Sequence, residues 1–154
     1  GRAMKSIKAI AGDRETVTVE RRTSVRDAAR AMTEHQIGAV PVLDNGRVVG
    51  IFTERDVMGR VVAAGLDSEH TTVDDVMSTD LIVADIAEGY EACLARMQQA
   101  RVRHLLVLDG GRLAGIVSLR DLLVADANEK DEAITMLNAY LHYIPADIHT
   151  TKSG

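Results

Sequence analysis

The sequence is poor in the residues on which cross-links and redox centres depend. Its 154 residues include one cysteine, two prolines and no tryptophan, and aromatic residues make up 3%. A single cysteine, Cys93, excludes an internal disulfide and any CxxC-type metal or redox site. We therefore expect a reducing, cytoplasmic compartment, with Cys93 as an inert thiol on the apolar face of a helix.

Positive charge and long apolar runs are also scarce. The chain has 18 Lys and Arg against 23 Asp and Glu, and its formal net charge of -5 disfavours nucleic acid as the main partner. No apolar stretch approaches the roughly 18 residues of a membrane span, so we expect no membrane segment. Hydrophobic residues still make up 46%, enough for the core of one compact domain or of two fused halves.

Motifs typical of catalytic sites are missing as well. The five histidines are scattered, without HxH or HExxH spacing, and the glycines form neither GxGxxG nor a P-loop. We expect no catalytic residues, no metal and no dehydrogenase-type NAD site, so the protein is predicted not to be an enzyme.

The chain does contain an internal repeat. Shifted by 65 residues, residues 37–58 (IGAVPVLDNGRVVGIFTERDVM) align with residues 102–123 (VRHLLVLDGGRLAGIVSLRDLL), with nine identities in 22 positions and no gap. Residues 17–19 align with residues 82–84 at the same offset. The repeated unit is therefore a whole supersecondary structure.

Each copy is expected to contain a strand, a helix, a β-hairpin and a second helix. Periodicity and turn residues give these limits in the first copy: a strand at 16–19, a helix capped by Thr23 or Ser24, hairpin strands at 40–43 and 47–52 around Asn45-Gly46, and a helix at 54–64 ending at Gly65. The second copy repeats them, with Gly110-Gly111 in the turn and a helix beginning over 119–126.

These elements predict five segments: a lead-in at 1–12, a first repeat at 13–65, a linker at 66–77, a second repeat at 78–125, and a C-terminal helix and tail at 126–154. In the last segment Ile134, Leu137, Leu141 and Ile144 recur at helical spacing, and Pro145 ends the helix. Two interpretations of this apolar face stay open. It covers its own domain, or it contacts a second copy.

Both hairpins lead into one motif, Gly-hydrophobic-hydrophobic-Ser/Thr-x-x-Asp, at 50–56 and 115–121. The strand end delivers a hydroxyl and the first helical turn a carboxylate, beside free backbone N–H groups that attract anions. The carboxylate can accept the two hydroxyls of a ribose, and the intervening arginine can bind phosphate. A capping box would explain one such motif, but two copies at equivalent positions favour nucleotide binding.

This pattern resembles the CBS domain family, named for cystathionine β-synthase, over about residues 5–125. The resemblance implies an α+β fold, a tandem CBS domain pair of two βαββα repeats with pseudo-two-fold symmetry, here followed by a C-terminal helix. It also implies clefts for adenosine ligands: AMP, ADP or ATP first, with NAD(H) or S-adenosylmethionine as further candidates.

The resemblance assigns roles to single residues. Asp56 and Asp121 would hold ribose, and Thr53 and Ser118 would contact ribose or phosphate. The remaining assignments are Arg55 and Arg120 beside these hydroxyls, Gly38, Ala39, Val40 and Pro41 around the adenine, and their second-copy counterparts Arg103, His104, Leu105 and Leu106, of which the basic pair would meet phosphates.

Departures from the family pattern predict unequal clefts, because Leu106 replaces the usual proline and Gly38-Ala39 offers no basic pair. The leading hypothesis is an energy or redox sensor. Adenine-nucleotide binding would shift the two halves, or a homodimer, and an unidentified effector protein would read the shift. The second hypothesis is an interaction module with vestigial clefts, and the third is an enzyme that turns over a bound nucleotide.

Overall fold

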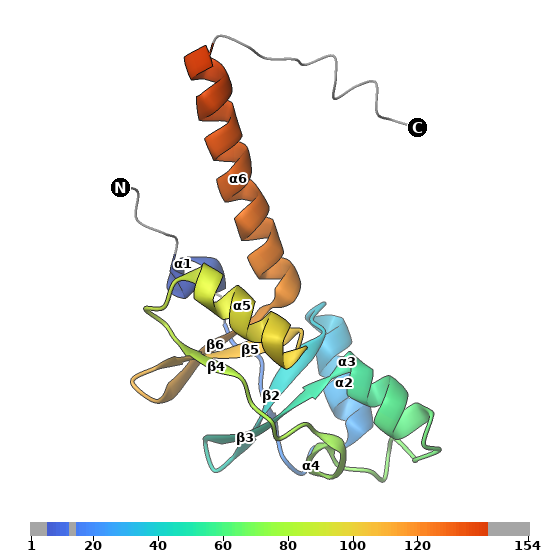
Figure 1. Cartoon of the computed structure of the whole chain (residues 1–154). Coiled ribbons are helices and arrows are strands. Elements are labelled where there is room, and N and C mark those ends of the chain that lie inside the picture. The colour runs from blue at the N-terminus through green and yellow to red at the C-terminus, as the bar shows by residue number, and fades with distance from the viewer. Residues whose placement is uncertain (1–5, 13–14, 142–154) are drawn as a thin grey trace, which may run out of the picture.

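Two small sheets with their helices form the body of the molecule, and one long helix extends from it (Figure 1). The structure, a computed structural model, describes residues 6–12 and 15–141. After α1 (Ile7–Ala11), the first repeat contains β1 (Val19–Glu20), α2 (Val25–Glu34), β2 (Ala39–Asp44), β3 (Arg47–Thr53), α3 (Glu54–Asp56) and the π-helix η1 (Val57–Val62). After α4 (Val73–Val76), the second repeat contains β4 (Val83–Asp85), α5 (Tyr90–Ala100), β5 (His104–Asp109), β6 (Arg112–Ser118) and α6 (Leu119–Leu141).

The two sheets have the same topology and the same register. Their strand orders are β1-β2-β3 and β4-β5-β6, with a parallel first pair and an antiparallel hairpin in each. Val19 pairs with Val42 as Ala84 pairs with Val107, at the offset of 65 seen in the sequence. The predicted α+β fold of two equivalent repeats is therefore confirmed.

The local signals for turns and caps are confirmed at their residues. Asn45 and Gly46 have φ of 51° and 81°, and the glycines of the second hairpin turn are also left-handed, as a two-residue turn of this type requires. Of the two candidate caps for α2, Ser24 is used, and its hydroxyl accepts the Asp27 N–H at 3.1 Å.

The predicted strand at 16–19 is wrong in extent, because β1 begins only at Val19. Pro41 accounts for one residue of this difference. In the second repeat the Leu106 N–H donates to the Ile82 carbonyl oxygen at 2.9 Å, and β4 begins at Val83 opposite Leu106. Pro41, at the position equivalent to Leu106, has no N–H to donate, so the parallel pairing of β1 starts one residue later.

A helix does begin at the predicted residue 54, but most of it is not an α-helix. Within this segment only α3 is α-helical. From Val57 the chain is a π-helix, in which the Ala63 N–H donates to the Met58 carbonyl oxygen at 2.9 Å. This winding buries Val61 in the core while Arg60 stays at the surface, beside Asp56. The helix ends at Val62 with Ala63 as its C-cap, two residues before the predicted end, and Gly65 follows with φ of 73°.

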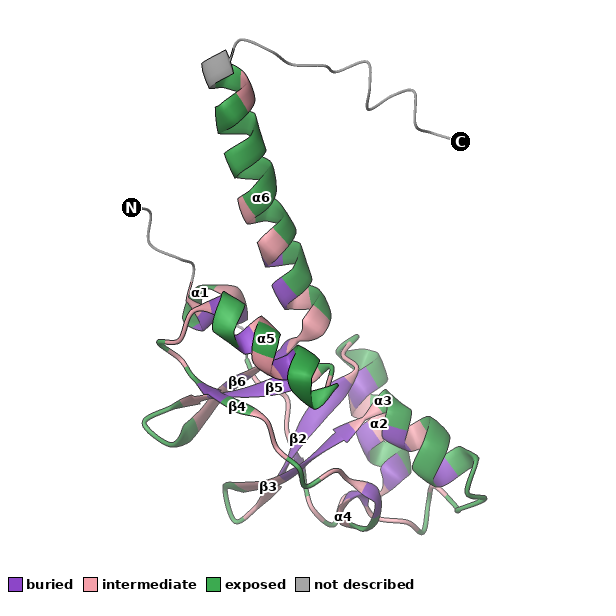
Figure 2. Ribbon diagram, viewed as in Figure 1, coloured by how far each residue is buried: buried purple, intermediate pink, exposed green. Residues whose placement is uncertain are grey.

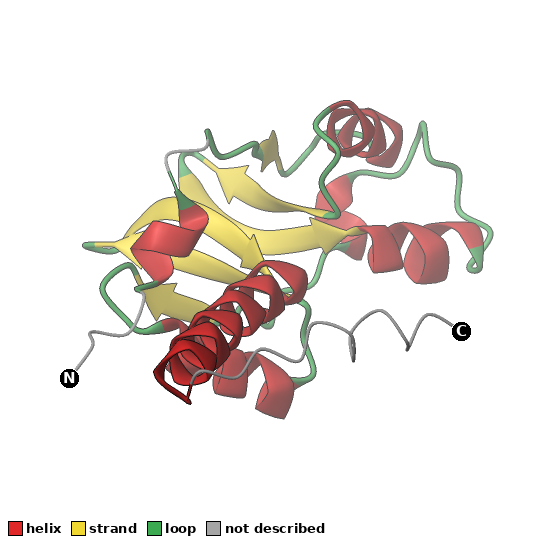
Figure 3. Ribbon diagram, turned by 90° about the horizontal axis from the view of Figure 1, so that it is seen from above, coloured by secondary structure: helices red, strands yellow, loops and turns green. Residues whose placement is uncertain are grey.

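Each of the short helices α1 and α4 packs on the repeat that it does not directly precede in the sequence. Ile7 and Ala11 of α1 pack in the core of the second repeat, whereas Val73 and Val76 of α4 pack in that of the first. A third cluster, around Ile51 and Leu106, lies between the two sheets. Figure 3 shows the strands of both sheets gathered centrally with helices around them. The repeats are thus joined at three places, which the sequence pattern did not reveal.

Helix α6 is one continuous helix of 23 residues, and it runs across residue 126 without a break. Among its residues up to 139, the last buried ones are Leu122 and Ala125, and Figure 2 shows the outer turns exposed. Ile134 and Leu137 are 54% and 56% exposed, so the interpretation that this face covers its own domain is wrong for them. Ile144, Pro145 and the predicted tail lie outside the described residues.

Candidate functional site

Two clefts lie where the repeats meet, and each is lined by both repeats. The first, of about 1360 Å³, combines Ser118, Arg120 and Asp121 of the second motif with residues 36–39 before and at the start of β2. The second, of about 740 Å³, combines residues 53–56 of the first motif with residues 101–104 before and at the start of β5. We call them the Asp121 cleft and the Asp56 cleft.

Both motifs are built as capping boxes. Asp56 Oδ2 accepts the Thr53 N–H at 2.9 Å and the Thr53 hydroxyl at 3.1 Å, while the hydroxyl accepts the Asp56 N–H at 3.3 Å. Asp121 Oδ2 accepts the Ser118 N–H at 2.9 Å, and the Ser118 hydroxyl accepts the Asp121 N–H at 3.0 Å. The structural role weighed in the sequence is therefore present in both copies, and it fixes each carboxylate at the wall of its cleft.

The surroundings of the two carboxylates differ. Asp56 is 6% exposed, and its Oδ1 lies 3.6 Å from Nε of Arg60, one turn along the helix. Arg60 also donates to the carbonyl oxygens of Val76 and Met77, at 3.2 and 3.0 Å. It thus links Asp56 to the end of α4. Residue 125, equivalent to Arg60 in the second repeat, is an alanine, and Asp121 is more exposed than Asp56.

Basic residues gather in the Asp56 cleft. Among the described residues four arginines line it, Arg55, Arg60, Arg101 and Arg103, whereas Arg103 and Arg120 line the Asp121 cleft. At the positions equivalent to Arg101, Arg103 and His104 the first repeat has Gln36, Gly38 and Ala39. Residues 36 and 101 are both left-handed, with φ of 53° and 57°, so the difference between them is one of side chain and not of backbone.

Sequence reasoning missed Arg60 and Arg101 as cleft residues. Both lie outside the family motif, and only the three-dimensional pairing of residues 101–104 with the first motif places them together. The alignment of the two repeats contained a signal for both residues, because it places Arg60 opposite Ala125 and Arg101 opposite Gln36.

Glu54, Arg103 and His104 form a wall common to both clefts. Burial lowers the pKa of His104 below its usual value, while the negative charges of Glu54 and Asp121 act in the opposite direction and Arg103 lowers it further. His104 is therefore neutral near pH 7, and an anion in either cleft would favour its protonated form.

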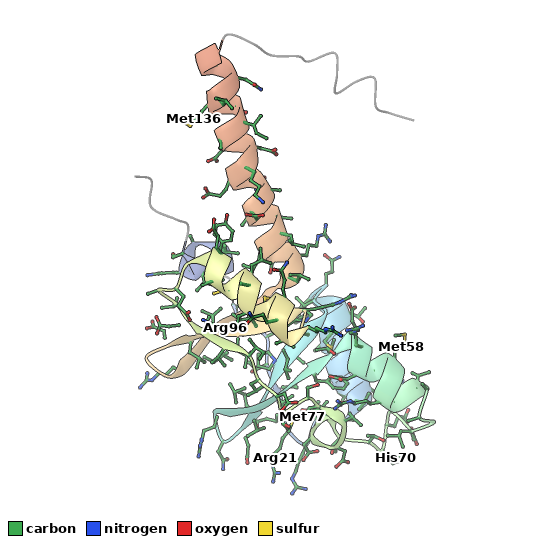
Figure 4. The ribbon with its side chains drawn as sticks, viewed as in Figure 1. Arg21, Met58, His70, Met77, Arg96 and Met136 are labelled. Carbon is green, nitrogen blue, oxygen red and sulfur yellow. The ribbon has the colours of Figure 1, made fainter. Side chains whose placement is uncertain are left out.

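Glycine at residue 50 of the first motif permits a close approach. A Cβ there would lie 2.8 Å from Met77 Cγ and 3.0 Å from the backbone oxygen of Ser78. Ser78 pairs with Ile51 through two backbone hydrogen bonds of 2.9 Å, and residues 77–82 line the Asp56 cleft (Met77 is labelled in Figure 4). At the equivalent Gly115 the nearest atom, Ala11 Cβ, is 3.8 Å away.

Three residues assigned to the adenine pocket lie elsewhere. Val40 and Leu105 are fully buried, each in the core of its own repeat, and Pro41 pairs with Ile51 inside the first sheet. None of their side chains lines either cleft, whereas Gly38 and Ala39 line the Asp121 cleft and Leu106 lines the Asp56 cleft. The residues carried over from the resemblance thus divide into cleft residues and core residues.

Cys93 is fully buried in the second core, and burial raises the pKa of its thiol, as expected of an unreactive cysteine. In the part of the chain that the structure describes, no group of three or more His, Cys, Asp and Glu side chains is placed to hold a metal ion. Within the same residues, no helix combines the length and the apolar character needed to cross a membrane.

Comparison with known proteins gives consistent matches. The model of the CBS domain matches residues 7–63 and 73–128. The CBS domain-containing protein YhcV of Bacillus subtilis is 33% identical over 124 residues, which are 80% of this chain and 88% of that protein.

Solved structures resemble the fold closely. The CBS-domain containing protein ATU1752 from Agrobacterium tumefaciens superposes with a TM-score of 0.73 at 35% identity, over 79% of this chain and 99% of that one. The CBS domain pair of protein MJ0100, in complex with 5′-methylthioadenosine and S-adenosyl-L-methionine, has a TM-score of 0.73 over 82% and 99% of the two chains. At 23% identity that likeness shows the fold alone.

Proposed function

This chain belongs to the CBS domain family, and we propose that it is a non-catalytic regulatory module that binds an adenosine ligand between its repeats. The observation that carries the proposal is the composition of the clefts. Each brings a buried or half-buried aspartate and a hydroxyl from one repeat against the hairpin entry of the other. A ligand in such a place contacts both halves of the molecule at once.

We assign ribose binding to Asp56 and Asp121. In each, one carboxylate oxygen holds the capping box, and a carboxylate can accept further hydrogen bonds, including those of two ribose hydroxyls. In the Asp56 cleft the ribose would share the carboxylate with Arg60. Thr53 and Ser118 stand beside these carboxylates, and the small residues Gly38 and Ala39 leave room for the adenine in the Asp121 cleft.

We assign phosphate binding to the Asp56 cleft. Arg55, Arg60, Arg101 and Arg103 line it together with His104, and guanidinium groups bind phosphate oxygens in pairs. This charge favours AMP, ADP or ATP in that cleft. NAD(H) and S-adenosylmethionine remain candidates for the more open Asp121 cleft, and a complex of the same fold with S-adenosyl-L-methionine supports including this ligand in the first tests.

The ligand would act by changing how the two repeats meet. The sheets touch through Ile51 and Leu106, and the common wall of Glu54, Arg103 and His104 faces both clefts. Filling either cleft therefore changes the contacts of one shared surface, which can shift the repeats or a homodimer of them. An effector protein of unknown identity would read that shift.

The first test is thermal unfolding with AMP, ADP, ATP, NAD, NADH and S-adenosylmethionine. A ligand at 100 times its Kd adds about 2.7 kcal/mol, which raises Tm by several degrees in a domain of this size. We expect a selective rise with at least one adenine nucleotide. No rise with any of the six would favour an interaction module with vestigial clefts, and conversion of a bound nucleotide, followed by chromatography, would indicate an enzyme.

Variants then assign the carboxylates. Asp121→Asn and Asp56→Asn keep an oxygen for the capping box but lose the charge, so each should weaken its own cleft about tenfold, and Asp56→Asn also loses the ion pair with Arg60. Asp109→Asn, at the exposed end of β5 before the second hairpin turn, is the matched control. Calorimetry showing the parent's affinity in both cleft variants would contradict the assignment.

A further inference from the structure

Arg103 is the one arginine that lines both clefts among the residues that the structure describes. Within the same residues, the Asp56 cleft has three further arginines, Arg55, Arg60 and Arg101, and the Asp121 cleft has one, Arg120. Arg103 is exposed, and its guanidinium makes no hydrogen bond or ion pair in the described part of the chain. Its side chain is therefore available to a ligand on either side.

The backbone of Arg103 is held in place, whereas its side chain is not. Leu119, the first residue of α6, donates its N–H to the Arg103 carbonyl oxygen at 2.7 Å. In the first repeat the Glu54 N–H donates to the Gly38 carbonyl oxygen in the same way, at 2.9 Å. Arg103 thus has a fixed backbone position between the clefts, and only rotation about its side-chain bonds decides which cleft its guanidinium occupies.

The charge balance makes Arg103 more important to the Asp121 cleft than to the Asp56 cleft. Without Arg103, three described arginines still line the Asp56 cleft, but one lines the Asp121 cleft. The carboxylates that line the Asp121 cleft are those of Glu15, Glu54 and Asp121. The Glu54 carboxylate lies close to the hairpin entry, because a Cβ at Gly38 would be 3.2 Å from its Oε1. Among the described lining residues, carboxylates then outnumber arginines wherever Arg103 is withdrawn.

One guanidinium does not bind two phosphates as well as it binds one. Its donors form a single planar fork, which fits the oxygens of one phosphate in pairs. When the fork faces a phosphate in the Asp56 cleft, it is turned away from the Asp121 cleft, and the first phosphate also repels a second. An adenosine ligand without phosphate needs no fork and suffers no such repulsion. Because binding free energies are linked, two phosphate ligands weaken each other by the same factor.

We propose that the two clefts share Arg103, so that a phosphate ligand in the Asp56 cleft disfavours a second phosphate ligand in the Asp121 cleft and leaves that cleft to an adenosine ligand without phosphate. This sharing rests on the proposed function, since it needs an adenosine ligand in each cleft. Its consequence is a preferred doubly bound state with one phosphate ligand and one phosphate-free ligand. The protein then responds to the two kinds of ligand together and not to the total amount of nucleotide.

Isothermal titration calorimetry of the full chain with AMP measures the sharing. In the parent, the second binding step is that of the Asp121 cleft beside an occupied Asp56 cleft. In Arg101→Gln/Arg60→Ala the Asp56 cleft binds AMP poorly, so the first step is that of the Asp121 cleft beside an empty neighbour. We expect this Kd to be about tenfold or more below the second Kd of the parent, as one charged hydrogen bond is worth. Neither removed arginine lines the Asp121 cleft, and removing positive charge does not by itself strengthen phosphate binding.

Adenosine and a matched variant are the controls. Adenosine has no phosphate, so its Kd for the Asp121 cleft should agree within about twofold between the two proteins. Arg103→Gln, added to both proteins, should reduce the difference in AMP affinity to less than about twofold, although it weakens AMP binding in each. Arg112→Gln removes the same charge at an exposed residue outside both clefts, so it should leave the tenfold difference unchanged.

Three results would overturn the sharing. The first is a parent whose second AMP step is as strong as the first step of the double variant, and the second is a parent whose second step is stronger still. The third is a difference that persists after Arg103→Gln, because another contact would then carry it. In all three cases normal adenosine binding leaves the proposed function intact. Absence of binding of both AMP and adenosine would instead refute the proposed function, and the sharing with it.

Discussion

The Asp121 cleft and the Asp56 cleft are built from equivalent residues of one repeat, yet they differ where the repeats have diverged. The Asp121 cleft contains Gln36, Gly38 and Ala39, where the Asp56 cleft has Arg101, Arg103 and His104. Ala125 likewise corresponds to Arg60. The two clefts therefore share their backbone and differ in charge. A duplicated fold can thus keep one ribose site in two places while a few substitutions give each a different preference for phosphate.

The largest expected effect comes from giving the Asp56 cleft the residues of its counterpart. Arg101→Gln/Arg60→Ala does this at two positions. Each lost charged hydrogen bond is worth about 1.5–3 kcal/mol, so the affinity for ATP should fall by about 10²- to 10⁴-fold. Isothermal titration calorimetry measures this loss.

Adenosine is the control ligand for this double variant because it has no phosphate. Its affinity should change by less than about fivefold, since neither arginine is needed for a ribose or an adenine. If adenosine and ATP weakened equally, the arginines would be holding the fold of the cleft and not the phosphates.

Next in size is a difference in stability between the two motif glycines. Gly50→Ala pushes a Cβ against Met77 and the backbone oxygen of Ser78, and overpacking of this kind costs about 1–3 kcal/mol. Gly115→Ala meets only ordinary contacts, so its cost should stay below about 1 kcal/mol. Urea unfolding of the pair measures both, and equal costs would show that the wall formed by residues 77–78 yields without strain.

The sequence predicted the parts that depend on local chemistry. The left-handed turn at Asn45-Gly46, the Ser24 cap and the offset between repeats all follow from residue types at fixed spacing. It did not predict which repeat each lead-in helix packs on, because Ile7 and Val73 are equally apolar toward either core.

The same limit applied to the clefts. Asp56 and Asp121 were found from one motif, but the partners of each come from the other repeat, and the sequence pattern does not show how the two sheets face each other. Val40 and Leu105 show a second limit of the sequence pattern, because it does not tell which assigned residues turn their side chains away from the clefts. Strand residues next to a cleft alternate between faces, and these two side chains point into the cores.

A smaller effect should follow from the reciprocal change in the Asp121 cleft. Gln36→Arg introduces the charge of Arg101 on a backbone that is already left-handed, so the substitution needs no change of conformation. One added guanidinium near a phosphate should strengthen ADP or ATP binding there by about fivefold to tenfold. Calorimetry in the background of Arg101→Gln/Arg60→Ala isolates this cleft, and Thr33→Arg, one helical turn earlier on its rim, tests whether position matters.

The smallest expected effect is the pH dependence due to His104, which both clefts share. Its folded pKa is lowered by burial, so the unfolded chain binds more protons below an ordinary pKa of about 6.5. The stability of the free protein should therefore fall as the pH drops through that region.

A phosphate in the Asp56 cleft stabilises the protonated ring of His104. The affinity of the cleft for a phosphate ligand should therefore rise over the same pH range, by at most about tenfold per pH unit. The charged groups that face the ring are Glu54, Asp121 and Arg103. His104→Gln should flatten both trends in calorimetry and thermal unfolding between pH 5.5 and 8. Unchanged trends in that variant would place the titrating group outside the common wall, and the two clefts would then respond to pH independently.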